Sequence, residues 1–212
     1  MKTKLILIGG GGHCKACIDV IEQTEQYEIV GILDLAELVD TSVLSYKIVG
    51  TDQEIVKYVK LGYSFLITVG QIKSAVLREK LFNQLIEARA NIATIIAPSA
   101  YVSKYSKMGV GTIVMHHAII NAGVTIGKNC ILNNKCDIEH DTVIGNHTHI
   151  STGAIVNGDC KIGDGAFIGS SATIANQLTI DDEVVVGAGA VVIKNITTTD
   201  IQAGNPAKSI KM

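Results

Sequence analysis

The sequence predicts an α/β domain with a small parallel sheet, followed by a parallel β-helix built from hexapeptide repeats. Two observations lead to this prediction. Over residues 1–97, short apolar strands alternate with amphipathic helices, an order that implies right-handed βαβ crossovers and a Rossmann-like domain. From about Ala100 to Val192 the pattern changes to a strict repeat of six residues. We therefore expect two domains, at 1–97 and 98–212.

The N-terminal half begins with a strand, a glycine turn and a helix. Lys4–Ile8 is a short apolar run, glycines occupy positions 9–12, and apolar residues line one face of residues 15–23. A second strand is expected at 28–33, where it ends in Asp34. The remaining expected elements are helices at 53–59 and 72–88 and strands at 64–68 and 94–96, with Pro98 ending the pattern.

The C-terminal half is defined by its period. Apolar residues recur at every sixth position from Val102 to Val192, sixteen times without exception. Because about half of ordinary residues are apolar, chance would give such a run roughly once in 10⁴ to 10⁵ trials. A triangular coil needs one inward aliphatic residue per wall and a small residue near each corner, so three hexads make one coil. Glycines such as Gly109, Gly127 and Gly145 are expected to ease the turns.

Composition excludes several classes of protein. The net charge of −2, with mixed signs, leaves no basic stripe for nucleic acid. No run of 18 apolar residues exists. We therefore expect no membrane insertion and a cytoplasmic location.

The flat outer walls of a coil stack favour packing around a threefold axis, which predicts a homotrimer.

Five cysteines show no zinc-type pairing. Cys14 and Cys17 form a CxxC pair that redox or metal chemistry would use, but Cys17 falls on the expected buried face of a helix. The other three stand at the small inward position of the hexads, where cysteine acts as a small apolar residue; they are Cys130, Cys136 and Cys160. No metal is expected.

The glycine turn precedes a helix, whose free N–H groups and dipole favour an anion such as phosphate. Gly9, Gly11 and Cys14 fall where a GxGxxG fingerprint has three glycines, so Cys14 breaks the pattern. Asp34 nevertheless stands where a carboxylate meets a ribose hydroxyl. These features disfavour NAD and leave a different nucleotide open.

Four segments carry a family resemblance, and they occur in both halves of the chain. They are Gly9–Lys15, Asn133–Asp141, His147–His149 and Gly204–Lys208. In these the chain resembles the PglD/NeuD-type sugar acetyltransferases. The resemblance implies left-handed coils, acetyl-CoA as co-substrate, and a homotrimer with active sites between subunits.

The resemblance also implies roles for individual residues. His140 matches the family's general base, and Asp141 matches the carboxylate that orients it, although a family member carries Glu there. Imidazole suits removal of a proton from an amine at neutral pH. Asn133 matches a site residue near the base. By the hexad register, His140 lies at a turn and His149 faces outward, which makes both available to a groove between subunits.

Binding residues are carried over by position. The matches to acetyl-CoA contacts are His149, Gly158, Ser170 and Ala188. The matches to the UDP-sugar contacts are Gly11, Gly12, His13, Asp34, Leu35 and Gly70, with Leu35 standing where the family often has a second acidic residue. Lys194 and Lys208 lie near the end of the β-helix and are candidates for the phosphates of CoA.

The expected activity is acetyl-CoA-dependent N-acetylation of a UDP-linked amino-dideoxysugar, of the UDP-4-amino-4,6-dideoxy-N-acetylhexosamine type, for surface glycan biosynthesis. O-acetylation of a sialic acid or another sugar would use the same base and stays open. A non-catalytic nucleotide-sugar-binding protein and an NAD oxidoreductase are the remaining alternatives, the second disfavoured by the broken fingerprint.

Overall fold

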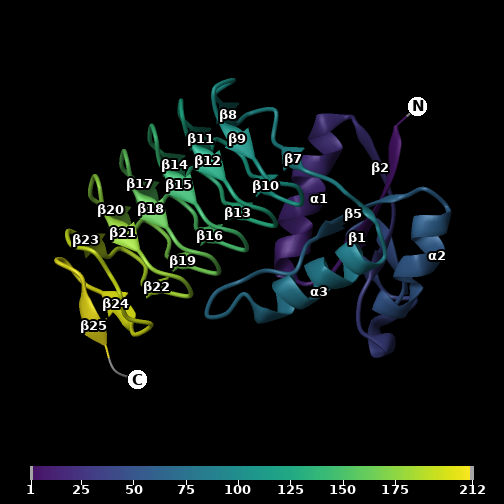
Figure 1. The fold of residues 1–212 in the computed structure, drawn as a ribbon. Helices are drawn as coiled ribbons and strands as arrows, with labels where there is room; N and C mark the ends of the chain where they lie inside the picture. The colour runs from purple at the N-terminus through teal and green to yellow at the C-terminus, as the bar shows by residue number, and fades with distance from the viewer. Residues whose placement is uncertain (1, 211–212) are drawn as a thin grey trace.

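The computed structural model describes residues 2–210, which form an α/β unit lying against the side of a triangular prism of stacked coils (Figure 1). The sheet of the α/β unit has the strand order β3-β4-β2-β1-β5-β6. Its strands are β1 (Thr3–Ile8), β2 (Tyr27–Leu33), β3 (Ser42–Val43), β4 (Tyr46–Gly50), β5 (Ser64–Ile67) and β6 (Asn91–Ile92). The helices are α1 (Gly12–Thr24), α2 (Ile55–Lys60) and α3 (Val76–Glu87), with 3-10 turns at Ala36–Leu38 and Asp52–Glu54.

Most elements predicted for the N-terminal half are present, with shifted bounds. The first helix begins at Gly12, directly after the glycine turn, and the helix predicted at 72–88 begins only at Val76. The two-stranded antiparallel extension made by β3 and β4 was not predicted. The sequence of this segment has no clear alternation of apolar and polar residues, so only the strand pairing at the sheet edge reveals the extension.

The strand predicted at 94–96 belongs to the prism and not to the N-terminal sheet. Strand β7 (Ile95–Ile96) pairs in parallel with β10 of the prism. The chain passes from the N-terminal sheet to the prism within three residues. The N–H of Ala93 donates to the carbonyl oxygen of Phe65 in the N-terminal sheet, and the N–H of Ile95 donates to that of Thr112 in the prism. The last strand of the N-terminal sheet is instead β6. The domain division at 97/98 stays a prediction.

The prism is a left-handed parallel β-helix with three walls. Wall 1 contains β7, β10 (Ile113–Val114), β13 (Ile131–Leu132), β16 (His149–Ile150), β19 (Phe167–Ile168), β22 (Val185–Val186), β24 (Ile201–Ala203) and β25 (Lys208–Ile210). Wall 2 contains β8 (Tyr101–Val102), β11 (Ile119–Ile120), β14 (Asp137–Ile138), β17 (Ile155–Val156), β20 (Thr173–Ile174) and β23 (Val191–Val192). Wall 3 contains β9 (Lys107–Met108), β12 (Thr125–Ile126), β15 (Val143–Ile144), β18 (Lys161–Ile162) and β21 (Thr179–Ile180).

The sixteen inward apolar positions predicted from the hexads are confirmed, and all lie in or against one continuous core. The corners obey the same period: from Gly111 to Gly189, every sixth residue has positive φ, fourteen in succession. The glycines predicted to ease the turns are different ones and do not have positive φ. They are needed because coils stack closely there: a Cβ on Gly127 would lie 2.6 Å from the backbone of Gly145.

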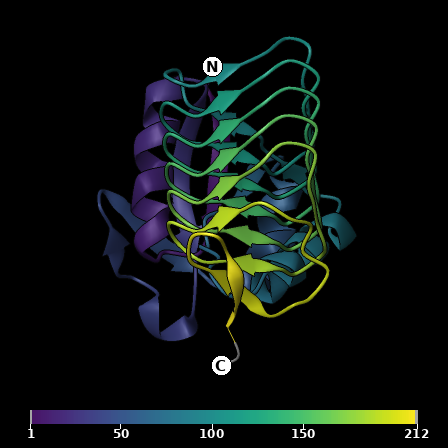
Figure 2. The same cartoon turned by 90° about the vertical axis from the view of Figure 1, so that its left-hand side faces the viewer.

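The α/β unit covers wall 1 of the prism. Helix α1 runs alongside the stack of coils (Figure 2) and buries Cys14, Cys17 and Ile18 in one cluster with Ile113 and Ile131 on the outside of that wall. The outward side chains of Ile95, Ile113 and Ile131 on wall 1 are therefore buried within a single chain, whereas Tyr101 and Ile119 on wall 2 are exposed. No helix within residues 2–210 is long and apolar enough to cross a membrane.

Candidate active site

His140 and Asp141 form a pair on the corner between walls 2 and 3, after β14 and before β15. Asp141 occupies the left-handed position of this corner, with φ 61°, and its Oδ2 lies 2.9 Å from Nδ1 of His140. The side chains are 60% and 68% exposed. The predicted outward position of His140 is confirmed, and the shorter Asp reaches the ring.

This geometry fixes the useful state of the imidazole. The carboxylate accepts the Nδ1 proton, so in the neutral ring Nε2 carries a free lone pair. The hydrogen bond that His140 donates to Asp141, together with the charges of Asp141, Glu139 and Asp159, raises the pKa of His140 above its ordinary value. Gly158 lies beneath the ring, one coil further on, and leaves the space that the ring occupies.

His149 faces outward from wall 1, as predicted, but the α/β unit covers it and only 6% of it is exposed. Its Nδ1 lies 2.6 Å from the backbone carbonyl of Gln71, which can only accept, so the proton is on Nδ1. Nε2 therefore accepts from Nδ2 of Asn133, at 3.1 Å. Burial lowers the pKa of His149 to about 4. The predicted availability of His149 to a groove was wrong for this chain, because both ring nitrogens are occupied.

Asn133, Ser170 and Ala188 lie on a different corner, between walls 1 and 2. Oδ1 of Asn133 accepts the N–H of Asn134, which fixes its amide orientation. Oγ of Ser170 lies 3.0 Å from Oγ of Ser151. The structure thus separates Asn133 from His140 by the width of wall 2.

The predicted nucleotide residues surround the carboxyl ends of β1, β2 and β5, where the strand order reverses. Asp34 and Leu35 line a cavity of ≈ 310 Å³ together with Gly9 and with Lys80 of α3. Both oxygens of Asp34 are engaged by backbone N–H groups, those of Gly10 and Leu35. Asp34 therefore holds the glycine turn in place, and Lys80 is a cation at this cavity that the sequence did not single out.

Gly11 and Gly12 border open space, since an added Cβ would meet nothing within 4 Å. Next to them, His13 packs against Gly70, whose added Cβ would lie 3.4 Å from Cβ of His13. Burial, Arg78 and His149 lower the pKa of His13 to about 4, so its ring is neutral. Its Nε2 is buried without a hydrogen-bond partner.

The cysteines act as core residues. All five are buried thiols without a disulfide, and burial raises the pKa of Cys17, which disfavours the thiolate that redox or metal chemistry needs. Within residues 2–210, no group of three or more His, Cys, Asp or Glu side chains is arranged to hold a metal ion.

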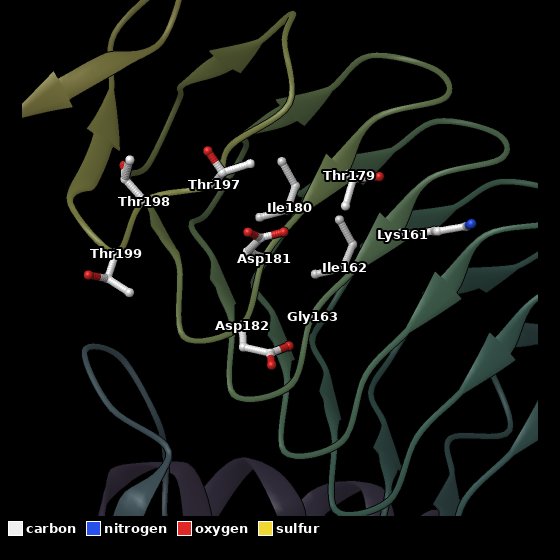
Figure 3. A pocket seen from close by; sticks show the side chains of 10 residues that line it. All are labelled: Lys161, Ile162, Gly163, Thr179, Ile180, Asp181, Asp182, Thr197, Thr198 and Thr199. Carbon is white, nitrogen blue, oxygen red and sulfur yellow. The ribbon is translucent and has the colours of Figure 1, made fainter.

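Two further cavities lie near the C-terminal end of the prism. Lys194 and Lys208 line the same one, of ≈ 410 Å³. The other, of ≈ 440 Å³, lies on wall 3 beneath Thr197–Thr199 (Figure 3). Figure 3 shows the ammonium of Lys161 pointing away from the carboxylates of Asp181 and Asp182. None of the predicted site residues lines this cavity on wall 3.

Comparisons with known proteins match both halves of the chain. The PglD N-terminal domain family matches residues 4–85, and the bacterial transferase hexapeptide (six repeats) family matches residues 141–176 and 159–194. Comparison with curated protein sequences gives no match.

Solved structures match over nearly the full length. The acetyltransferase domain of PglB from Neisseria gonorrhoeae FA1090 in complex with acetyl coenzyme A is 28% identical, with 99% of this chain and 100% of that chain covered and a TM-score of 0.91. A histidine-to-asparagine mutant of perosamine N-acetyltransferase from Caulobacter crescentus, in complex with CoA and GDP-perosamine, is 28% identical, with 99% and 97% covered and a TM-score of 0.92.

The fold, the exposed histidine–carboxylate pair and these matches define a hexapeptide-repeat acyltransferase with an N-terminal α/β domain. These matches confirm the resemblance to the PglD/NeuD-type sugar acetyltransferases in both halves of the chain.

Proposed function

We propose that this chain transfers the acetyl group of acetyl-CoA to the amino group of a nucleotide-linked aminosugar, with His140 as general base. The observation that carries the proposal is the exposed His140–Asp141 pair, whose geometry leaves Nε2 free. The similarity to an acetyltransferase domain bound to acetyl coenzyme A and to a perosamine N-acetyltransferase bound to CoA and GDP-perosamine supports both substrates.

The chemistry requires one base. The amine nitrogen attacks the thioester carbonyl carbon, a C–N bond forms, and the C–S bond breaks when the tetrahedral intermediate collapses. The amine proton passes to Nε2 of His140, and the imidazolium returns a proton to the departing thiolate of CoA. Asp141 orients the ring through Nδ1 and stabilises its charged form.

We assign the nucleotide to the cavity at the carboxyl ends of β1 and β2. A ligand in an open α/β sheet binds where the strand order reverses. Gly11 and Gly12 at the start of α1 leave room for a phosphate at the helix N-terminus, and Lys80 adds a positive charge at the cavity. Uridine diphosphate is the expected nucleotide, and a 4-amino-4,6-dideoxy-N-acetylhexosamine the expected sugar.

This assignment requires a second copy of the chain. The nucleotide cavity belongs to the unit on wall 1, while His140 lies on the corner between walls 2 and 3, which in a three-walled prism is opposite wall 1. A single chain therefore does not bring its own base to its own nucleotide. A homotrimer, with each site formed between two subunits, joins the two parts and covers the exposed Tyr101 and Ile119 of wall 2.

Acetyl-CoA is the expected co-substrate, and we expect it to follow the prism wall between subunits. Ser170 and Ala188 stand on the corner that would border its pantetheine arm, and Gly158 lies beside the base. Lys194 and Lys208 share a cavity that would take phosphates. His149 then acts by positioning Asn133 and not as a donor to the thioester oxygen. A cytoplasmic location stays a prediction.

The test is thiol release from acetyl-CoA with UDP-linked and GDP-linked 4-aminosugars, compared with the corresponding 4-hydroxysugars. Turnover with an aminosugar, and its loss by about 10²- to 10⁴-fold in His140→Asn, is expected. His117→Asn is the matched control, because His117 is another exposed corner histidine. Turnover of the hydroxysugars alone would replace N-acetylation by O-acetylation, and full activity of His140→Asn would overturn the mechanism.

A further inference from the structure

A buried guanidinium joins the two units of the chain. Arg78 lies in the first turns of α3 and is 1% exposed. Its Nη1 donates to the carbonyl oxygens of Ile67, at 3.1 Å, and Val69, at 2.6 Å. Its Nη2 donates to the carbonyl oxygen of Asn129, at 3.0 Å, and to Oδ1 of the same residue, at 2.7 Å. One side chain thus holds the end of β5 and a corner of the prism.

This cation has no carboxylate partner. Within residues 2–210, the ion pairs are Lys57–Glu54, His116–Asp19 and His140–Asp141, and none includes Arg78. Burial lowers the pKa of Arg78 to about 10, which leaves it charged at neutral pH. Its Nε is buried without a partner as well. A buried, unpaired charge is a poor source of stability, since an apolar side chain of similar size avoids the desolvation cost.

The segment that Arg78 holds leads directly into the site. Val69 is followed by Gly70, which packs against His13 of the glycine turn, and by Gln71, whose carbonyl oxygen accepts the proton of His149. Gln71 also donates through Nε2 to the carbonyl oxygen of Gly165, on the prism, at 3.2 Å. The contacts of residues 67–71 therefore reach both the nucleotide turn and the histidine on wall 1.

The prism end of the contact is equally constrained. Asn129 is 1% exposed and occupies the left-handed position of its corner. Its Nδ2 donates to the carbonyl oxygen of Arg78, at 3.2 Å, and to Nδ1 of His147, at 3.0 Å. Arg78 and Asn129 thus bond to each other in both directions, which fixes the rotation of the α/β unit against the prism.

We propose that Arg78 is a positioning residue for acetyl transfer: it clamps residues 67–71 and the nucleotide-binding unit onto the prism, so that the sugar amine is presented in a fixed orientation. This inference rests on the proposed function. The nucleotide sugar is held by one chain and the base belongs to the next. The sugar amine can therefore meet the base in a productive geometry only if rigid contacts fix both to the prism. Arg78 also places a positive charge near His13 and His149, and this charge helps to keep both rings neutral.

The test compares Arg78→Met and Arg78→Lys with Arg89→Met, a change of the same kind at the exit of the same helix. In Arg78→Met we expect backbone amides of residues 67–71 to exchange hydrogen about tenfold faster. We expect kcat/KM for the nucleotide sugar to fall by about 30-fold or more, while KM for acetyl-CoA changes by less than about twofold. Arg78→Lys keeps the charge and some carbonyl bonds, so it should recover part of both losses.

The NMR titration of His149 gives a readout that needs no substrate. Loss of the Arg78 charge should raise the pKa of His149, whereas Arg89→Met should leave it unchanged. If Arg78→Met fails to fold, Asn129→Gly provides the test. This variant keeps the left-handed corner and removes the side-chain amide. Hydrogen exchange of residues 67–71 should become faster, and kcat/KM for the nucleotide sugar should fall while KM for acetyl-CoA changes little. The proposal would be overturned if the amides of residues 67–71 exchange at the wild-type rate, or if kcat/KM for the nucleotide sugar stays within about twofold of wild type. A wild-type protein without acetyl transfer would instead refute the proposed function, and exchange and titration would still test the clamp.

Discussion

A Cβ atom on Gly158 would lie 2.6 Å from Nε2 of His140 and 2.7 Å from its Cε1. The two residues stand on successive coils at the same corner, so the ring of His140 lies directly against the backbone of the next coil. Gly158 was predicted as a contact of acetyl-CoA, a role that stays a prediction. Its place in the structure gives it a second role, because only glycine leaves this space for the ring of His140.

The substitution Gly158→Ala should displace the ring of His140 and lower kcat by about 10- to 100-fold, since a misplaced base loses most of its effect. The measurement is a double-mutant cycle with His140→Asn. If Gly158 acts through the ring, Gly158→Ala has no further effect in the His140→Asn background. Independent, multiplicative losses would show that Gly158 acts on the co-substrate instead.

Activity should depend on the protonation of His140. The free base is the neutral ring, and Asp141 raises its pKa, so kcat/KM should fall as the pH drops through a value above the ordinary pKa of about 6.5. In Asp141→Asn the raising charge is gone, so the acid limb should move to lower pH while the plateau rate falls. A pH–rate profile of both proteins checks this. An unshifted acid limb would mean that another group titrates.

Gly12→Ala should separate binding from stability. The added Cβ meets nothing within 4 Å, and alanine favours the first turn of α1, so the free energy of unfolding should stay the same or rise by up to ~1 kcal/mol. KM for the nucleotide sugar should rise about tenfold or more if a phosphate approaches this backbone, and KM for acetyl-CoA should not change. Urea denaturation and steady-state kinetics measure the two effects. Unchanged KM values would remove the phosphate from this turn.

Subunit mixing should test the shared site. A His140→Asn chain lacks the base and a Gly12→Asp chain lacks the nucleotide contact, so each homotrimer is inactive. In equal mixtures reassembled from unfolded chains, about a quarter of the sites would combine an intact base with an intact nucleotide unit from a neighbour. Recovery of about a quarter of the wild-type activity is expected. Sites formed within one chain would give none.

Stability should fall in acid because of the buried histidines. The pKa of His149 is about 4 in the folded chain and about 6.5 when unfolded, so below pH 6.5 the unfolded state binds the proton first and is favoured. The contribution of His149 to this loss, between pH 6.5 and 4, is on the order of 3 kcal/mol. Urea denaturation at both pH values should show a smaller loss for His149→Gln than for wild type, and an unchanged loss for His117→Gln.

The hexads were predictable because each coil repeats a local requirement, one inward aliphatic residue per wall, whatever the rest of the chain does. The strand at 94–96 was predicted as a strand and given to the wrong sheet, because its two residues pair with β10, eighteen positions further on, and no local pattern records that choice. The exposure of His149 was wrong for a similar reason. The hexad register of His149 is set by its neighbours in the sequence. The segment that covers the side chain contains Gln71, which is far away in the sequence.

Sequence alone therefore determined the period of the prism, the outward placement of His140 and its adjacent carboxylate, and the resemblance to the PglD/NeuD-type sugar acetyltransferases. Tertiary structure decided what lies against each wall. It buried His149 and Arg78 between the two units, separated Asn133 from His140, and set the cavity at Asp34 opposite the corner that carries His140. The physical reason is that a coil has three equivalent walls by pattern, and only the docking of α1 on Ile113 and Ile131 makes one of them different.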